Sequence, residues 1–293
     1  MFKRFCLFTI FVFMVMGGPA WAGKSHYVPG IEGIKAATLP PEGFYYRMYN
    51  VFYNANEYRD NSRNEQSFDA SVYCMANRFI YTTSIDVLGA DLAFDVIVPV
   101  QYSDINTKGP GGHDHHWGLG DILIEPLVLG WHGDRWDALF AAGAWVPTAN
   151  YQSDRAGNAG KGFWTFMFTA GGTYYFDEAK SWSASVLARY QTNTEREDSD
   201  VTYGDIFHFE WGLGKAINQY IEVGGAGYCS WQVTKDHGNG STSEKEQMYG
   251  VGPEVIFNIP DWATSVSLRS LWEFENKNAT QGNVTTISIT RAF

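Results

Sequence analysis

Residues 90–102, ADLAFDVIVPVQY, decide the fold of this chain, because their apolar side chains recur at every second position. One face carries Leu92, Phe94, Val96, Val98, Val100 and Tyr102, and the other carries Asp91, Ala93, Asp95, Pro99 and Gln101. Successive side chains of a strand point to opposite sides, whereas a helix spaces its apolar residues three and four apart. The stretch therefore predicts a β-strand with one apolar face and one polar face.

The same alternation recurs along the chain and predicts about twelve strands. They cover residues 43–54, 70–82, 90–103, 119–131, 136–147, 163–176, 181–193, 204–216, 219–234, 246–258, 262–275 and 284–293. Long polar connections at 55–69, 104–118, 148–162, 194–203, 235–245 and 276–283 alternate with short ones, of which 83–89 is the least certain to be a tight turn.

Such two-faced strands also occur in soluble sandwiches, so two further features carry the fold assignment. Aromatic residues gather at the strand ends, and short connections alternate with long ones, as in outer-membrane barrels. We therefore predict an all-β protein, a transmembrane antiparallel up-and-down β-barrel of about twelve strands over residues 43–293. A soluble periplasmic β-protein is the alternative.

The first twenty-two residues predict export. Lys3 and Arg4 precede an apolar stretch at 5–16, and Ala20, Trp21 and Ala22 form a small-x-small cleavage signal before Gly23. About twelve apolar residues are too few to span a bilayer, and no later stretch reaches about eighteen. Residues 1–22 are therefore a predicted signal peptide cut between Ala22 and Gly23, and a mature chain in a membrane must form a closed barrel.

Composition excludes several classes of protein. The 293 residues carry a formal net charge of −11, with 32 acidic and 21 basic side chains, so nucleic acid is not an expected partner. Three cysteines cannot build a disulfide scaffold or a cysteine-rich zinc site.

The faces opposite the aromatic ones are predicted to line the barrel interior. They carry seven acidic and four basic residues and one histidine, namely Arg47, Arg78, Asp95, Asp121, Glu125, Arg189, His208, Glu210, Glu222, Glu254, Arg269 and Glu273. Buried charges must be paired or hydrated, which leaves two readings open. The residues line a narrow, mildly cation-preferring pore, or they form an arginine–carboxylate network that closes the barrel.

Catalysis, cofactors and metals are not predicted. The histidines of the stretch His113, Asp114, His115 and His116 could bind a metal, but they are expected in a glycine-rich, solvated loop. No serine and histidine align on neighbouring lipid-facing positions, as an outer-membrane hydrolase would need.

Residues 29–45, PGIEGIKAATLPPEGFY, resemble the start of a bacterial family named for the meta-pathway of phenol degradation. Val98, Pro99 and Val100, and the stretch 118–121, GLGD, are similar to later parts of the same family. The resemblance implies outer-membrane barrels that are described as transporters and encoded near genes of aromatic catabolism. It implies hydrophobic or aromatic substrates and no catalytic residues.

Both ends of the mature chain have expected roles. In residues 23–42, Ile31, Ile34 and Ala37 could share one face of a short helix ended by prolines, packed in or under the periplasmic mouth as a plug. A loosely ordered lead is the alternative. The last strand ends in Phe293, which resembles the signal read by the barrel assembly machinery, although Arg291 departs from that pattern.

The sequence thus predicts a monomeric barrel in the outer membrane of a Gram-negative bacterium, acting as a passive channel for small molecules. Its expected partners are outer-membrane lipid, the assembly machinery and a small-molecule solute. The resemblance favours aromatic or hydrophobic compounds, whereas the polar inner faces fit hydrated solutes equally well. The alternative is a non-conducting structural or surface-binding barrel with a plugged lumen.

Overall fold

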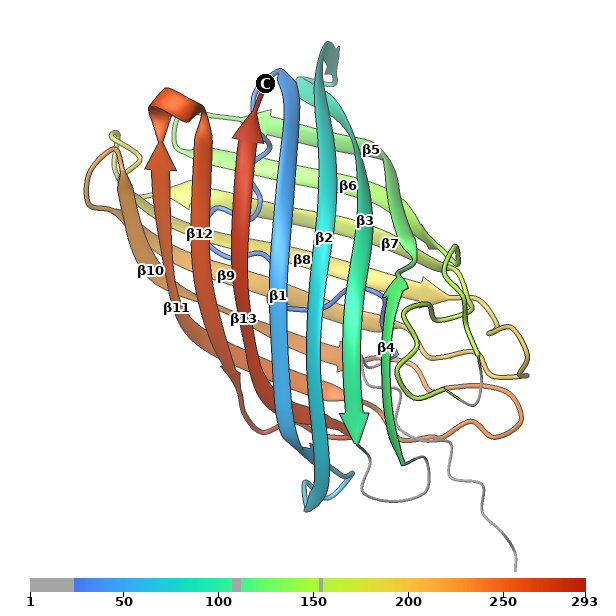
Figure 1. The fold of residues 1–293 in the computed structure, drawn as a ribbon. Coiled ribbons are helices and arrows are strands. Elements are labelled where there is room, and N and C mark those ends of the chain that lie inside the picture. The colour runs from blue at the N-terminus through green and yellow to red at the C-terminus, as the bar shows by residue number, and fades with distance from the viewer. Residues whose placement is uncertain (1–23, 107–111, 153–154) are drawn as a thin grey trace, which may run out of the picture.

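The computed structural model of the chain describes residues 24–106, 112–152 and 155–293 (Figure 1). The predicted signal peptide and its cleavage site at Ala22 and Gly23 lie outside these residues. The strands are β1 (Gly43–Arg59), β2 (Glu65–Val87), β3 (Ala90–Asn106), β4 (His113–Leu119), β5 (Ile122–His132), β6 (Trp136–Val146), β7 (Thr165–Tyr175), β8 (Trp182–Asn193), β9 (Ile206–Ala216), β10 (Ile221–Gln232), β11 (Gln247–Ile259), β12 (Thr264–Glu273) and β13 (Ala279–Ala292).

These strands form a closed antiparallel β-barrel. Neighbours along the chain pair with one another, and β1 closes the ring by pairing with both β2 and β13. The short strand β4 pairs only with the end of β3, and β5 follows it after a break at Gly120 and Asp121 and pairs with the rest of β3. The ring therefore has twelve strands, which confirms the predicted fold.

The two ends of the barrel differ. The turn end carries the short connections 88–89, 133–135, 176–181, 217–220 and 260–263 and the C-terminus. The loop end carries the connections 60–64, 194–205, 233–246 and 274–278 and the described parts of the connections that follow β3 and β6. In outer-membrane barrels the short turns face the periplasm.

Side chains alternate across the wall as the sequence predicted. Phe94 of β3 is 42% exposed on the outer face, whereas its neighbour Asp95 is 2% exposed inside. In β7, Phe166 and Phe168 are exposed and Met167 is buried. This pattern suits a wall with lipid outside and a packed polar interior.

Three predicted loops are shorter than expected because the strands continue into polar sequence. Strand β1 extends to Arg59, β2 already begins at Glu65, and β13 already begins at Ala279. Residues 113–119 form β4, so the prediction of a loop for the four residues His113 to His116 is wrong. Backbone pairing continues there although most of the side chains are polar, and the few apolar ones, such as Phe68 and Ile105, are buried together.

Segment 24–42 is neither the predicted helix nor a loose lead. It is a chain of turns, with hydrogen bonds from Ala36 N to Gly33 O and from Thr38 N to Lys35 O. Positive φ angles of 91° at Gly30 and 58° at Lys35 prevent a continuous helix. Its contacts with strands on all sides, described below, place it inside the ring, where it appears as the dark blue trace in Figure 1.

Candidate functional site: the filled lumen

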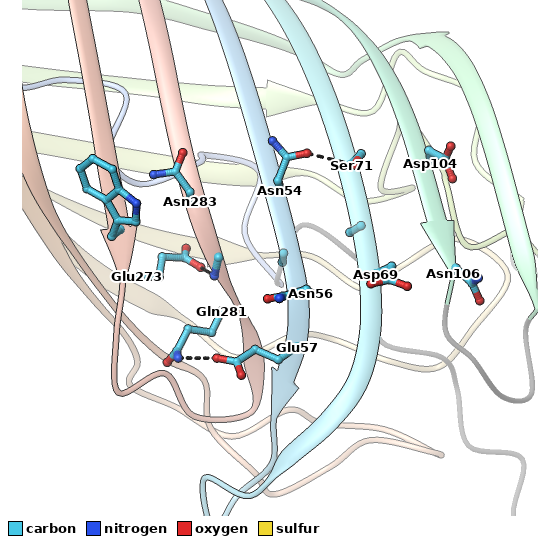
Figure 2. Close-up of a pocket in the computed structure, with 14 residues that line it drawn as sticks. Asn54, Asn56, Glu57, Asp69, Ser71, Asp104, Asn106, Glu273, Gln281 and Asn283 are labelled. Atoms are coloured by element: carbon cyan, nitrogen blue, oxygen red, sulfur yellow. Dashed lines mark hydrogen bonds between the residues drawn. The ribbon is translucent and has the colours of Figure 1, made fainter.

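A polar groove of about 720 Å³ crosses β12, β13, β1, β2 and β3 at the loop end (Figure 2). Amide and carboxylate side chains, among them Asn54, Asp69 and Asp104, make up most of its lining. Glu57 accepts a hydrogen bond of 2.5 Å from the Gln281 amide. The groove is open, and the buried ionic groups of the interior form the stronger candidate site.

Segment 24–42 runs along the interior from the loop end to the turn end. Lys24 Nζ lies 2.7 Å from Asp236 in the connection 233–246. Near the other end, Thr38 Oγ1 donates to Asp137 at 2.9 Å, and Pro40 O accepts from Thr82 at 3.1 Å. The segment thus reaches well beyond the periplasmic mouth at which it was expected.

The carboxylate of Glu32 is held in a cradle of three wall residues, Arg47, Tyr49 and Arg78. Arg47 Nη1 lies 3.2 Å from Oε2, and Arg78 Nη1 lies 3.1 Å from Oε1. The Tyr49 hydroxyl donates to Oε1 at 2.5 Å. Two guanidinium groups and a hydroxyl give the strong charge-assisted hydrogen bonds that a buried carboxylate requires.

Arg78 also belongs to a second wall cluster. It forms an ion pair with Asp95, and its Nη2 lies 3.5 Å from Glu125 Oε2. Both carboxylates are buried. Arg78 is therefore neutralised by the wall itself as well as by the segment.

Glu210 of β9 binds the backbone of the segment. Its Oε1 accepts from Gly30 N at 2.8 Å and from Glu32 N at 2.9 Å, and its Oε2 accepts from the Tyr27 hydroxyl at 2.8 Å. Arg189 forms an ion pair with the same carboxylate. This wall pair therefore satisfies segment N–H groups that burial would otherwise leave unpaired.

A second wall pair acts in the same way. Arg269 Nη1 lies 2.8 Å from Glu254 Oε1, while Glu254 Oε2 accepts from Ile34 N at 2.8 Å. Arg269 donates to the carbonyls of Gly30, at 3.0 Å, and Ile31. Together the two pairs fix residues 30–34 at the centre of the barrel.

His26 belongs to segment 24–42 and lies near the loop end, buried among residues of the wall. Its Nε2 is 2.9 Å from Asp121 Oδ2 and its Nδ1 is 2.7 Å from Thr165 Oγ1. The ring stacks on Trp145 with centroids 5.7 Å apart. Burial lowers the pKa of His26 to about 4; the bond to Asp121 opposes this effect and the charge of Lys161 adds to it.

The structure gives each remaining predicted inner-face residue a partner. His208 is fully buried and stacks on Tyr27, with centroids 5.0 Å apart. Glu222 accepts from Lys35 Nζ at 2.7 Å. Of the twelve predicted residues, ten are buried, and Arg47 and Arg78 are half-buried.

Glu273 is held by two tyrosines of the wall. It accepts hydrogen bonds from the hydroxyls of Tyr53 at 3.0 Å and Tyr228 at 2.5 Å, and from Gly282 N at 2.7 Å. With these bonds both of its oxygens have partners in the interior.

Sequence reasoning did not identify the segment's own functional groups. Glu32, His26 and Lys35 each bind a wall residue, and Asp137 of β6 is a buried acid that it also omitted. The only available signal was Glu32, a single acid between Gly30 and Gly33 in an otherwise apolar stretch.

The histidine stretch lies on β4, away from the segment. His113 Nε2 lies 2.6 Å from Asp104 Oδ1, and the rings of His113 and His115 have centroids 5.8 Å apart. Within the described part of the chain, no three histidine, cysteine or acidic side chains are grouped so that they could hold a metal ion.

No helix among the described residues is long and apolar enough to cross a membrane. The fold is similar to the COG4313 outer membrane channel from Pseudomonas putida F1, with a TM-score of 0.78 and 12% identity over 88% of this chain and 97% of that one. This similarity shows the fold, and the protein is an outer-membrane β-barrel of a Gram-negative bacterium.

Two further structures match with lower TM-scores. The toluene transporter TodX of Pseudomonas putida matches at 0.45 and 11% identity, over 94% of this chain and 97% of that one. A FadL homologue of Pseudomonas aeruginosa matches at 0.45 and 10% identity, over 94% and 96%. At TM-scores below 0.5, neither of these two similarities bears on the fold.

No curated protein matches the chain. The model of the family described as "Putative MetA-pathway of phenol degradation" matches residues 54–289, which is most of the chain and most of the barrel. The chain therefore belongs to this family of the phenol-degradation pathway.

Proposed function

We propose that the protein is an outer-membrane channel for the passive passage of small molecules, aromatic or hydrophobic compounds among them, and that segment 24–42 is its gate. The observation that carries this proposal is the way the lumen is filled. A single chain segment occupies the lumen, and polar, non-covalent contacts hold it there.

The two wall ion pairs that bind the segment's backbone stay intact when the segment leaves. Arg189 remains paired with Glu210, and Arg269 with Glu254, when the segment is absent. Water can replace the segment's N–H groups as donors to the two carboxylates. Arg47 does lose its paired carboxylate, but its side chain is 29% exposed, so water can hydrate its charge.

Barrel size supports the same conclusion. An eight-stranded barrel is filled by its own side chains, whereas barrels of sixteen or more strands hold an aqueous channel. At twelve strands the wall leaves room that the segment occupies, so withdrawal of the segment opens a path of intermediate width.

The route of the segment also favours a signal peptide over residues 1–22. Removal of that peptide would make Lys24 the second residue of the mature chain, and Lys24 contacts the connection 233–246 at the loop end. If residues 1–22 were retained, this apolar stretch would have to pass through the whole lumen for Lys24 to reach the loop end.

A disulfide lock tests the gate. A Cβ added to Gly214 would lie 2.5 Å from Ile34 Cγ2, so these two positions are in direct contact and are chosen for a pair of cysteines. The variant I34C/G214C is made in a chain whose free Cys74 and Cys229 are replaced by serine. We expect few openings in planar bilayers when it is oxidised, and discrete conductance steps after reduction.

The serine-replaced chain with native Ile34 and Gly214 is the control, and its openings should not respond to the reductant. If the unlocked, folded chain inserts but never conducts, the channel proposal is wrong and the plugged structural barrel replaces it. If the oxidised variant conducts as well as the reduced one, the segment is not the gate.

A further inference from the structure

The three wall residues that bind Glu32 lie beside an apolar patch of the inner wall. Its buried side chains include Val51, Ala76, Ile97, Leu123, Trp145 and Met167, and the ring of Tyr49 belongs to it. Two segment residues cover this patch, Tyr27, which is buried in the same cluster, and Ile31, which packs against it. The segment thus presents an aromatic ring, an aliphatic side chain and a carboxylate to one region of the wall.

Arg47 differs from the other wall arginines in its partners. Arg189 and Arg269 each have a wall carboxylate within ion-pair distance, and Arg78 has two. In the described part of the chain, Glu32 of the segment is the only carboxylate that pairs with Arg47. The Arg47 charge is therefore neutralised only when something other than the wall supplies an anion.

Solvent already reaches this cradle with the segment in place. The side chains of Arg47 and Arg78 are 29% and 17% exposed, whereas those of Arg189 and Arg269 are 5% and 3% exposed. A solute could therefore reach the two guanidinium groups that hold Glu32 more easily than the two that bind the segment's backbone.

We propose that Arg47, Arg78 and Tyr49, with the adjoining apolar patch, form a binding site for small amphiphilic carboxylates of the benzoate class. Residues 27–32 fill this site as an internal mimic of the solute. The inference rests on the proposed channel function, because a solute occupies the site in full when the segment has withdrawn.

The chemistry of the site favours carboxylates over neutral aromatics. Guanidinium groups and a hydroxyl match the two oxygens of a carboxylate with charge-assisted hydrogen bonds. An alcohol of the same shape would leave the Arg47 charge without an anion, and a buried group without its partner is penalised. A carboxylate without a ring would leave the apolar patch uncovered.

The site can be tested without conduction by measuring whether added benzoate binds once the Glu32 carboxylate has been removed. The variant Glu32→Ala, in the mature chain 23–293 in detergent, removes the internal carboxylate together with its volume. Isothermal titration measures its binding of benzoate, benzyl alcohol and acetate. We expect benzoate to bind at least about tenfold more tightly to E32A than to the native chain, and more tightly than either other probe.

Two further variants serve as a test of Arg47 and as a control in the same binding measurement. E32A/R47Q should lose about tenfold or more of the affinity for benzoate, since one charge-assisted partner is gone. Glu42→Ala removes an exposed carboxylate from the same segment and should bind benzoate as the native chain does. Heat-modifiable migration on gels confirms that each variant is folded.

The outcomes separate this inference from the channel proposal. If benzoate and benzyl alcohol bind E32A equally, or if E32A/R47Q binds benzoate as tightly as E32A does, the carboxylate site is wrong whether or not the protein conducts. If benzoate binds selectively while bilayer recordings of the native chain stay silent, the site stands and the channel proposal fails.

Discussion

Gly33 permits a close approach of the segment to the wall. A Cβ at this position would lie 2.0 Å from Glu254 Oε2 and 2.5 Å from Arg269 Nη1. On the facing strand, a Cβ at Gly212 would lie 2.5 Å from Gly33 C. Since Gly33 has no positive φ, its role is to leave room for an ion pair rather than to permit a special turn.

The substitution Gly33→Ala should therefore release the segment without unfolding the barrel. The added methyl must displace the paired Glu254 and Arg269, which favours the undocked segment. We expect proteases to cleave within residues 24–42 at least about tenfold faster, with unchanged heat-modifiability. Gly225→Ala is the matched control, because its Cβ would meet only Gly252 O at 3.8 Å. Equal cleavage of the two variants would contradict the assignment.

His26 should make the gate sensitive to acid. Its pKa is about 4 when docked, mainly because of burial, and about 6.5 when exposed. The docked state therefore binds fewer protons, and docking weakens as the pH falls from 6.5 toward 4. Between pH 7 and pH 5 we expect the open probability to rise on the order of tenfold. The variant His26→Gln should show a nearly flat profile, and an unchanged rise would assign the effect to other groups.

At the scale of elements, alternation located the strands and failed at their loop ends. In residues 90–102 one face contacts lipid and the other packs inside, so periodicity is strong. At Glu57, Ser67 and Gln281 the pairing continues although these side chains are polar. Hydrophobic pattern cannot distinguish such a strand from a loop when few of its side chains are apolar, even though burial still alternates over residues 67–72 of β2.

Phe293 directly follows the last strand, β13, and its side chain contributes little to the fold. Phe293 is 72% exposed; its backbone N–H donates to Phe44 O at 3.0 Å, and its ring lies 5.8 Å from that of Phe44. The backbone bond survives substitution, so the exposed ring is available for recognition. This geometry suits the predicted role of Phe293 as an assembly signal.

Phe293→Ala should therefore impair assembly in cells and leave stability unchanged. We expect several-fold less heat-modifiable barrel in the outer membrane, and the same melting temperature after refolding in detergent. Phe176→Ala removes another aromatic ring, 52% exposed at the same end, and should assemble normally. If the two variants assemble to the same level, Phe293 is not the signal.

At the scale of the whole molecule, the sequence identified the wall side of the candidate site but not the segment side. Alternation selected residues such as Arg78, Glu210 and Arg269, which are all at least half-buried and in contact with the segment. The position of Glu32 depends on threading a non-periodic chain through a closed ring. Neither spacing nor composition carries that information, and the spacing of Ile31, Ile34 and Ala37 suggested a helix instead.

Ion pairs join segment 24–42 to the rest of the protein, so the salt concentration should change how often the gate opens. Four lysine or arginine ion pairs connect the segment to the rest of the protein: Lys24–Asp236, Glu32–Arg47, Glu32–Arg78 and Lys35–Glu222. His26 adds a contact with Asp121. Raising KCl from 0.1 to 1 M shortens the Debye length from about 10 Å to about 3 Å. Buried pairs resist this screening, but a released segment returns through solvent and loses the long-range attraction.

We therefore expect the open probability in planar bilayers to rise several-fold between 0.1 and 1 M KCl, beyond the increase in single-channel conductance. Oxidised I34C/G214C provides the control, because its covalent bond does not depend on salt and its openings should stay rare. An open probability that is independent of salt would mean that the apolar contacts of Tyr27 and Ile31 hold the segment, with the ion pairs contributing little.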